Sequence, residues 1–424
     1  SVKLVGITAP MTGSGKTTVT VSLLSKIKNS VGIKIGPDYI DVGLLSSISG
    51  NRAWNMDRWI QGKSYTKIFQ RLASRYDVGI VEGVMGLYDS GFRIDVSTMF
   101  YFKKFKIPYI LVIDISKVAE SAYYIANKFL TKNSIGVILN KYGSEKHLEM
   151  VSKKFKDNGI KVLGAIPNDK ELNIEERHLG LKTAGELSNL GEIANKVSRY
   201  IDFSFIDSLP EYEIKEEPED YRESGKGNIW IAYDNAFNFY YTDTLDALEK
   251  LGKVRYFSPI RGEIPEEPDL IYIGGGYPEL YSDVLSTQKD LLKFIKDYYE
   301  SGGRIIAECG GLMYLEREMV VNGKRYGMTD IFHGSVKMGD RPVLGYTELL
   351  VLKDSILLKK GEIAKGHEFH YSSIDDPGYK SMKNLIGKGI DGYDGRLEKN
   401  VLGSYSHFSL ATYYKRLYRN LYER

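Results

Sequence analysis

The segment from Ala9 to Thr18, APMTGSGKTT, constrains the fold of this chain more than any other feature. A strand-like run, Val2 to Ile7, precedes it, and a helical run, Val19 to Lys28, follows at once. A glycine-rich loop between a strand and a helix lets backbone N–H groups surround a phosphate at the helix N-terminus. The first glycine that is usual in such loops is replaced by Pro10. The segment nevertheless predicts a phosphate-binding loop at the edge of a parallel sheet.

Two side chains of this loop suit ATP and Mg²⁺. Lys16 would place a positive charge at the β and γ phosphates, and the hydroxyl of Thr17 can hold Mg²⁺. The residues expected to bind the nucleotide are Gly13, Ser14, Gly15, Lys16, Thr17 and Thr18. The alternative is a glycine-rich turn with a chance lysine, but the order of strand, loop and helix argues against it.

Acidic residues follow two later strand-like runs. The segments are GPDYID, residues 36–41, and VEGVMGLYD, residues 81–89. Mg²⁺ prefers oxygen ligands, and the carboxyl ends of parallel strands face one ligand crevice. We therefore expect four acids to converge near the loop, although each alone could be a solvated loop residue: Asp38, Asp41, Glu82 and Asp89. Asn140, which ends another strand, is expected either to contact the purine or to act as a structural cap.

Short β-rich runs alternate with helical patterns through the first 200 residues. The predicted strands are 3–8, 31–35, 78–81, 109–113, 136–139 and 162–166. This alternation is typical of a parallel sheet wound with helices. A polar, charged segment follows and is typical of an interdomain linker: EYEIKEEPEDYRESGKG. We predict an ATP-dependent synthetase domain at 1–208, a linker at 209–227 and a second α/β domain at 228–424.

The second domain starts with another alternating series and ends in a β-rich stretch. Its predicted strands are 228–233, 254–257, 270–273 and 304–307, followed by β-rich sequence from 343 to 406. The fold class is therefore α/β with two domains, which suits a chain of 424 residues.

Cys309, the only cysteine, lies between the strand-like run IIAE and the residues GGLM. Such a turn raises the thiol over a helix N-terminus, whose dipole favours thiolate. His407, which closes the last strand-like run, is the candidate base. The glycines of GGGYPEL, Gly275 and Gly276 among them, offer backbone N–H groups for an oxyanion hole. Alone, each of these residues would more often be structural, so their combination carries the prediction.

Charge and hydropathy exclude several functions. A formal net charge of +3 gives no reason to expect a nucleic-acid partner, and no apolar run is long enough to span a bilayer. The N-terminal run lacks the features of a signal peptide, so we expect a cytoplasmic protein. A homodimer is left open.

Taken together, these residues resemble the cobyrinic acid a,c-diamide synthase family. That family joins a dethiobiotin-synthetase-like P-loop domain to a class I glutamine amidotransferase domain. The segments that carry the resemblance are APMTGSGKTTVT, IGPDYIDVG, VEGVMGLYD, ILNKYGSEKH, ERHLGL, GGGYPEL, AECGGLMYL and GHEFHYS.

The resemblance implies a carbon–nitrogen ligase of cobalamin biosynthesis that uses ATP, Mg²⁺ and L-glutamine. It implies that Thr17, Asp41 and Glu82 hold the metal, and that the acids serve metal, phosphate or substrate carboxylate. Cys309 would be the glutamine nucleophile and His407 its base. Many class I amidotransferases have a Glu two residues after this base, but here the position is Ser409. The orienting partner of His407 and the role of GHEFHYS stay unassigned.

The expected substrate is cobyrinic acid, whose a and c carboxylates would be amidated through acyl phosphates. Hydrogenobyrinic acid and nickel-sirohydrochlorin are alternatives with the same chemistry, and cobyric acid synthesis fits the chain length and loop less well. A P-loop regulator with an inert amidotransferase domain is a more distant alternative, against which the intact Cys309 and His407 argue.

Overall fold

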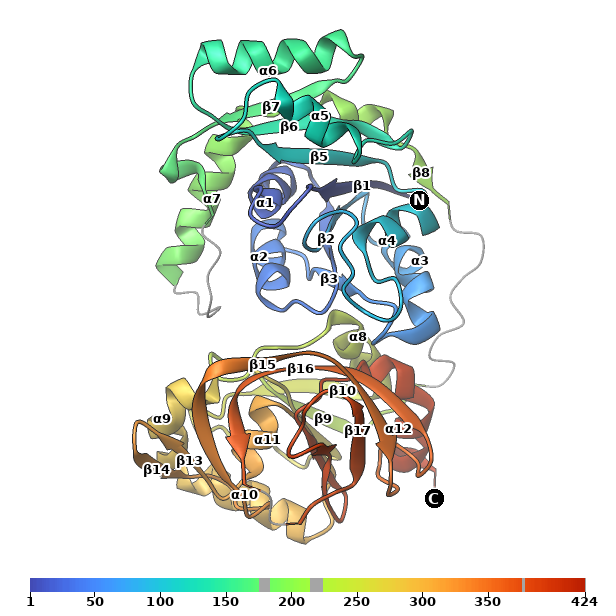
Figure 1. The fold of residues 1–424 in the computed structure, drawn as a ribbon. Coiled ribbons are helices and arrows are strands. Elements are labelled where there is room, and N and C mark those ends of the chain that lie inside the picture. Colours follow the sequence, from blue (N-terminus) through green and yellow to red (C-terminus); the bar gives the residue numbers. More distant parts are fainter. Residues whose placement is uncertain (175–183, 214–223, 376–377, 424) are drawn as a thin grey trace. The chain divides into compact units, whose positions relative to one another are not determined.

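The computed structural model of the protein describes residues 1–174, 184–213, 224–375 and 378–423. The chain forms two compact units: Ser1–Arg58 with Lys63–Pro218, and Trp59–Gly62 with Glu219–Arg424 (Figure 1). The short segment Trp59–Gly62 thus belongs with the second unit. The segment ERHLGL, 176–181, and the middle of the predicted linker, 214–223, lie outside the described residues. The bounds predicted for the domains stay a prediction.

The first unit is built on a sheet that has eight strands among the described residues. Its order is β3-β2-β4-β1-β5-β6-β7, all parallel, with β8 pairing antiparallel to β1. The strands are β1 (Val2–Thr8), β2 (Ser30–Ile35), β3 (Trp54–Met56), β4 (Val78–Glu82), β5 (Tyr109–Asp114), β6 (Ser134–Tyr142), β7 (Val162–Pro167) and β8 (Glu211–Tyr212). The parallel wound sheet predicted from the sequence is confirmed. β8, however, lies in the stretch predicted as linker.

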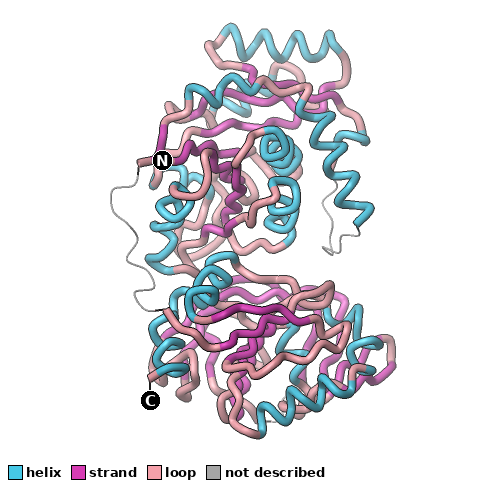
Figure 2. The backbone as a smooth tube through the Cα atoms, turned by 180° about the vertical axis from the view of Figure 1, so that it is seen from behind, coloured by secondary structure: helices cyan, strands magenta, loops and turns pink. Residues whose placement is uncertain are grey.

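Helices cover both faces of this sheet (Figure 2). They are α1 (Lys16–Lys26), α2 (Ile40–Ser49), α3 (Ile68–Ala73), α4 (Thr98–Lys104), α5 (Ser121–Asn127), α6 (Glu145–Asp157) and α7 (Ala184–Ser198). Because successive side chains of a strand point to opposite faces, neighbours in β1 enter different cores. Val5 packs with Val19 of α1, and Leu4 packs with Phe69 of α3. Because β1, β2 and β4 are parallel neighbours, their carboxyl ends lie at the same edge of the sheet.

The described residues of the second unit form two sheets. The first has the order β10-β9-β11-β12-β20-β19 and is parallel from β10 to β20. Its strands are β9 (Asn228–Ala232), β10 (Lys253–Phe257), β11 (Leu270–Ile273), β12 (Ile305–Glu308), β19 (Arg396–Glu398) and β20 (Val401–Ser404). Its helices are α8 (Thr242–Leu251), α9 (Ser282–Thr287), α10 (Lys289–Glu300), α11 (Gly310–Leu315) and α12 (Tyr414–Tyr422). The α/β class predicted for this half is confirmed.

The second sheet accounts for the β-rich stretch. Its strands are β13 (Glu318–Val321), β14 (Lys324–Gly327), β15 (Ser335–Val351), β16 (Ile363–Ile374), β17 (Met382–Ile386) and β18 (Tyr393–Asp394). The long strands β15 and β16 pair antiparallel, and a bridge between His367 and His407 links β16 to the segment after β20. None of the described helices has the length and apolarity needed to cross a membrane.

Candidate active sites

Gly13 and Gly15 give the phosphate-binding loop its shape. Their φ angles, +82° and +104°, lie in the left-handed region that favours glycine. A Cβ on Gly15 would lie 2.2 Å from Nδ2 of Asn140. That buried amide donates to the carbonyl of Ser14 over 2.9 Å. Asn140 therefore supports the loop, and its contact with the purine stays a prediction.

The loop and the adjoining strand ends enclose a cavity of about 960 Å³. This volume suits a nucleotide-sized ligand. Of the residues predicted for this site, the lining includes Gly13, Gly15, Lys16, Thr17, Thr18, Asp38, Asp41 and Glu82. Ser14, Asp89 and Asn140 do not belong to that lining within the described part of the chain. The structure thus brings most of the predicted residues to one cavity.

Lys16 and Thr17, the first residues of α1, contact the segment that ends β4. Nζ of Lys16 donates to the carbonyl of Met85 over 2.7 Å, and Oγ1 of Thr17 donates to Oε1 of Glu82 over 2.6 Å. The Thr17 hydroxyl and the Glu82 carboxylate thus already lie together, as the metal prediction required.

Lys34 of β2 lies among the acids of the cavity. Its Nζ is 3.0 Å from Oδ2 of Asp41 and 3.6 Å from Oε1 of Glu82, and it donates to the carbonyl of Gly83 over 3.0 Å. Asp38 joins the cluster through Oδ1, which accepts the N–H of Asp41 over 2.8 Å. Lys34 was not predicted as a site residue, although a lysine within the largely apolar run VGIKI was a signal in the sequence.

Burial sets the protonation of this cluster. It lowers the pKa of Lys34, but the carboxylates of Glu82 and Asp41 act more strongly together and leave that pKa raised. Burial raises the pKa of Glu82 to about 7, with Lys34 opposing the rise. Burial also raises the pKa of Asp38, and the neighbouring Asp41 carboxylate adds to the effect. Lys34 therefore keeps its positive charge, and burial favours the protonated forms of the nearby Glu82 and Asp38.

Asp89 shapes the loop that follows β4. Its Oδ2 accepts the N–H of Gly86 over 2.8 Å. A Cβ on Gly86 would lie 2.4 Å from the carbonyl oxygen of Pro10, so the two loops pass in close contact. Pro10, which replaces the usual glycine, thus packs against this second loop. A direct role of Asp89 toward substrate stays a prediction.

In the second unit, Cys309 forms a strained elbow between β12 and α11. Its φ and ψ are 51° and −102°, and its N–H donates to the carbonyl of Ser404 over 2.7 Å. A Cβ on Gly311 would lie 2.0 Å from the carbonyl oxygen of Ile273. Gly311 therefore lets the elbow pack onto β11. A non-glycine residue held at positive φ is characteristic of functional sites.

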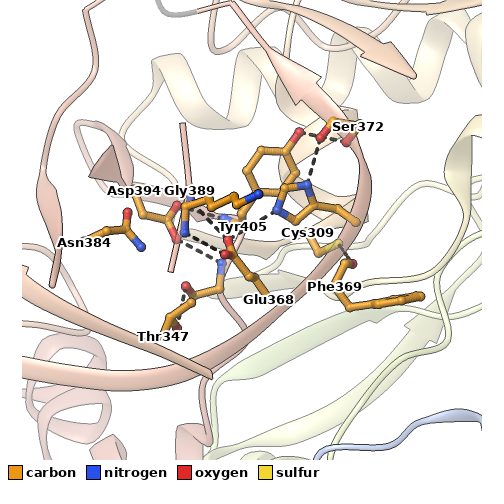
Figure 3. A network of polar contacts seen from close by, with 12 residues as sticks. Cys309, Thr347, Glu368, Phe369, Ser372, Asn384, Gly389, Asp394 and Tyr405 are labelled. Atoms are coloured by element: carbon orange, nitrogen blue, oxygen red, sulfur yellow. Dashed lines mark hydrogen bonds and ion pairs between the residues drawn. The ribbon is translucent and has the colours of Figure 1, made fainter. Parts of the chain in front are cut away.

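The thiol of Cys309 is buried, and its Sγ lies 3.2 Å from the carbonyl oxygen of Phe369 (Figure 3). Burial raises the pKa of this thiol, and the carboxylate of Glu279 raises it further. The N–H of Gly310 at the start of α11 lowers it, as expected, but by less. The helix N-terminus thus favours the thiolate, as the sequence predicted, but desolvation has the larger effect and leaves the pKa of the thiol raised.

The glycine-rich loop after β11 meets both predicted catalytic residues. A Cβ on Gly275 would lie 2.6 Å from Cε1 of His407, and one on Gly310 would lie 3.3 Å from the backbone nitrogen of Gly276. The carbonyl of Gly275 accepts the N–H groups of Asn238 and Phe239. A trans peptide points its N–H opposite to its C=O, so the N–H of Gly276 faces away from those donors. This orientation suits an oxyanion hole.

His407 is buried and exchanges two backbone hydrogen bonds with His367, of 2.8 and 3.2 Å. Burial lowers its pKa well below the ordinary value, and the nearby His367 and His370 lower it further. A neutral imidazole is the form that accepts a proton. Burial likewise lowers the pKa of His367 to about 4.

Glu308, the residue before Cys309, bonds to the segment that contains His407. Its Oε2 accepts the N–H of Phe408 over 2.6 Å, and the hydroxyl of Tyr272 donates to Oε1. Burial raises the pKa of Glu308 to about 8, while those two donors act in the opposite direction. Glu308 was not predicted as a site residue, although an acid that ends an apolar strand directly before the only cysteine was a signal in the sequence.

The segment GHEFHYS lies in β16 and supports the cysteine site. Glu368 accepts the N–H groups of Lys388 and Gly389, over 2.8 and 3.1 Å, and lies 3.3 Å from Nε2 of His370. His370 also stacks on Tyr405, with ring centroids 3.7 Å apart. Figure 3 shows Glu368 and Tyr405 in one network of polar contacts, and the separate contact of Cys309 with Phe369 close to it. Among the residues that the structure describes, no three His, Cys, Asp or Glu side chains are grouped to hold a metal ion.

Comparison with known domain families assigns a class to each half. Residues 5–181 match the CobQ/CobB/MinD/ParA nucleotide binding domain, and residues 228–414 match the CobB/CobQ-like glutamine amidotransferase domain. The chain therefore joins a nucleotide-binding domain to a glutamine amidotransferase domain.

Whole-chain relatives define the family. The cobyrinate a,c-diamide synthase of Sulfurisphaera tokodaii is 38% identical, with 96% of this chain and 97% of the relative covered. Those of Sulfolobus acidocaldarius (39%; 96% and 96%) and Caldanaerobacter subterraneus (38%; 95% and 94%) are similarly related. At this identity over nearly the full length, the chain belongs to the cobyrinate a,c-diamide synthase family of glutamine-dependent amidotransferase ligases. The resemblance seen in the sequence is confirmed.

Proposed function

We propose that this protein amidates the a and c carboxylates of cobyrinic acid, with ATP as the activating nucleotide and L-glutamine as the nitrogen donor. The observation that carries the proposal is the convergence of Lys16, Thr17, Asp41 and Glu82 on one cavity. The chain also carries a cysteine elbow and a buried histidine, and the glycine-rich loop after β11 approaches both segments. Membership of the family supports the choice of substrate.

In the first half-reaction, an oxygen of the substrate carboxylate attacks the γ phosphorus of ATP, and ADP leaves. Ammonia then attacks the acyl carbon, loses a proton and expels phosphate. Lys16 would neutralise charge on the phosphates, and Lys34 keeps the acids of the cavity from repelling them. The catalytic contribution is therefore positioning and electrostatic stabilisation.

The residues around Thr17 fit Mg²⁺. Oε2 of Glu82 is buried and has no hydrogen-bond partner among the described residues, while Oε1 contacts the Thr17 hydroxyl. Mg²⁺ commonly uses one or two carboxylates together with phosphate oxygens, so a three-carboxylate cage is not needed. Thr17 and Glu82, with Asp41 beside them, would hold the ion. Bound there, Mg²⁺ supplies positive charge to the reacting phosphates.

In the second unit, Sγ of Cys309 would attack the amide carbon of glutamine while its proton passes to His407. The N–H of Gly276 would stabilise the oxyanion. The proton then moves from His407 to the leaving ammonia, which leaves a glutamyl thioester on Cys309. Water hydrolyses this thioester to glutamate and restores the thiol.

The test is product mass after incubation of the purified protein with cobyrinic acid, ATP, Mg²⁺ and glutamine. We expect two successive losses of 1 Da, about the mass change of each conversion of a carboxyl to an amide, with one ATP consumed per step. Parallel incubations with hydrogenobyrinic acid and nickel-sirohydrochlorin decide between macrocycles. ATP hydrolysis without an amidated product from any of the three would contradict the proposal and favour a regulatory ATPase.

A further inference from the structure

A second hollow lies in the first unit, outside the cavity assigned to the nucleotide. It has a volume of about 660 Å³ and is formed by the loop after β4 and by α4. Residues that line it and matter here are Tyr88, Phe92, Arg93, Asp95, Lys103 and Lys104. Neither half-reaction described above uses any of them.

The lining of the hollow combines basic and aromatic side chains. Arg93, Lys103 and Lys104 are exposed, whereas the whole chain is nearly neutral. The opposing acid in the lining is Asp95, whose Oδ1 accepts the N–H of Ser97 over 3.0 Å. Among the described lining residues there are three basic side chains and one carboxylate, and this excess of basic groups favours anionic ligands.

The aromatic residues of the lining are Tyr88, Phe92 and Phe100. Tyr88 is 48% exposed and fixed at both ends: its hydroxyl donates to the carbonyl of Lys128 over 3.0 Å, and its ring packs on Phe129. The guanidinium of Arg58 lies 4.2 Å above the ring of Phe100. Rigid aromatic side chains suit a flat ring system more than a flexible chain. The ligand class is thus a planar molecule with several carboxylates.

The hollow and the nucleotide cavity share a wall. Met85 lines the nucleotide cavity and Tyr88 lines the hollow, and three residues of extended chain span at most about 11 Å. Nζ of Lys16 bonds to the Met85 carbonyl, and the N–H of Leu87 donates to the carbonyl of Ala9 over 2.9 Å. The wall is therefore anchored to the phosphate-binding loop. A macrocycle with carboxylates around its edge can lie in the hollow and still present one carboxylate to the phosphates.

We infer that this hollow binds the polycarboxylate macrocycle: Arg93, Lys103 and Lys104 hold carboxylates that are not being amidated, and Tyr88 and Phe92 contact the ring. The inference rests on the proposed function, since it names the place of that reaction's substrate. In this arrangement the three cations determine the affinity and orientation of the substrate and take no part in phosphoryl transfer.

The test measures equilibrium binding of cobyrinic acid, by dialysis with detection of its visible absorption, to wild type, Arg93→Gln and Lys103→Gln/Lys104→Gln. We expect binding about fivefold weaker for each cation removed, because each exposed ion pair contributes up to about that factor. The salt dependence of binding should fall in parallel. In turnover, KM for the macrocycle should rise while kcat stays near wild type. ATP affinity and glutamine hydrolysis should be unchanged.

Lys146→Gln is the matched control, since it removes one exposed lysine of the same unit, on α6, away from the hollow. Wild-type affinity in Arg93→Gln and in the double variant, with wild type itself binding cobyrinic acid, would overturn the inference and leave the proposed function intact. Equal weakening of ATP binding would also overturn it, because the hollow would then belong to the nucleotide site. If wild type neither binds nor amidates cobyrinic acid, the proposed function fails and the inference fails with it.

Discussion

Replacement of Lys34 by methionine should destabilise the first unit in a pH-dependent way. The variant keeps the length of the side chain but removes the ammonium that lies 3.0 Å from Asp41 and 3.6 Å from Glu82. Removal of one partner from a buried ion pair costs about 3 kcal/mol, because the remaining charges lose their compensation. For a unit of this size we expect the melting midpoint to fall by about 6–12 °C.

The pH dependence follows from Glu82. Its pKa rises from 4.5 to about 7 on folding, so the folded state keeps a proton that the unfolded state loses between those values. Stability therefore falls as pH rises through this window, by about 3 kcal/mol in total. Without Lys34, which lowers that pKa, the window extends above pH 7. The difference between variant and wild type should be smallest at pH 6 and largest at pH 8.5.

Thermal unfolding of both proteins at pH 6 and 8.5 measures this effect. Lys153→Met is the control, since its exposed pair with Asp157 should contribute little to the midpoint. Mg²⁺ with a non-hydrolysable ATP analogue should reduce the deficit, because the ion brings positive charge to Glu82. A shift that is equal at both pH values, or no larger than that of the control, refutes Lys34 as the counter-charge of these acids.

Four further predictions concern catalysis. Asp41→Asn should lower ATP-dependent amidation about a hundredfold without loss of fold, and normal turnover would contradict its role. Cys309→Ser should lose amide formation from glutamine but keep it from ammonium chloride at mildly alkaline pH; loss of both in a folded protein would refute the two-site division. Glu308→Ala leaves two buried donors unsatisfied at about 1–3 kcal/mol each, so glutamine hydrolysis should fall. Glu308→Gln should restore it. Equal glutamine hydrolysis by the Ala and Gln variants would argue that Glu308 does not position the histidine segment. Glu279→Gln removes a carboxylate that raises the pKa of the Cys309 thiol, so iodoacetamide should alkylate it faster at pH 8–9 than in wild type; an unchanged rate would exclude that influence.

The sheet of the first unit could be predicted because its strands are buried on both faces. Strands β2 and β4 consist wholly of buried residues, so their apolar runs are visible in the sequence. Strand β3, Trp54–Met56, was not predicted, since three residues are too few to show a pattern. β8 was taken for linker because its two residues lie in polar sequence and pair with β1 from more than 200 positions away.

Acids that follow strands of the predicted sheet, such as Asp41 and Glu82, could be predicted to converge, and other parts of the candidate sites could be predicted where one continuous segment carries the chemistry. The phosphate-binding loop and the cysteine elbow are such segments. Lys34 and Glu308 are different, because their roles arise from partners that are distant in sequence: Gly83, 49 residues from Lys34, and Phe408, 100 residues from Glu308. A single sequence gives the side chain in such pairs but not the partner that folding brings to it.

The protonation of the cysteine site depends on burial in the same way, and this bears on mechanism. A thiolate–imidazolium pair at rest would need a lowered thiol pKa and a raised imidazole pKa. The structure shows the reverse at Cys309 and His407, each shifted toward its neutral form mainly by burial. His367, which pairs with His407 through the backbone, has a pKa lowered to about 4 and brings no positive charge near neutral pH. In the mechanism that we propose, proton transfer from Cys309 would therefore accompany attack on the amide, so that the oxyanion at Gly276 and the new imidazolium form together.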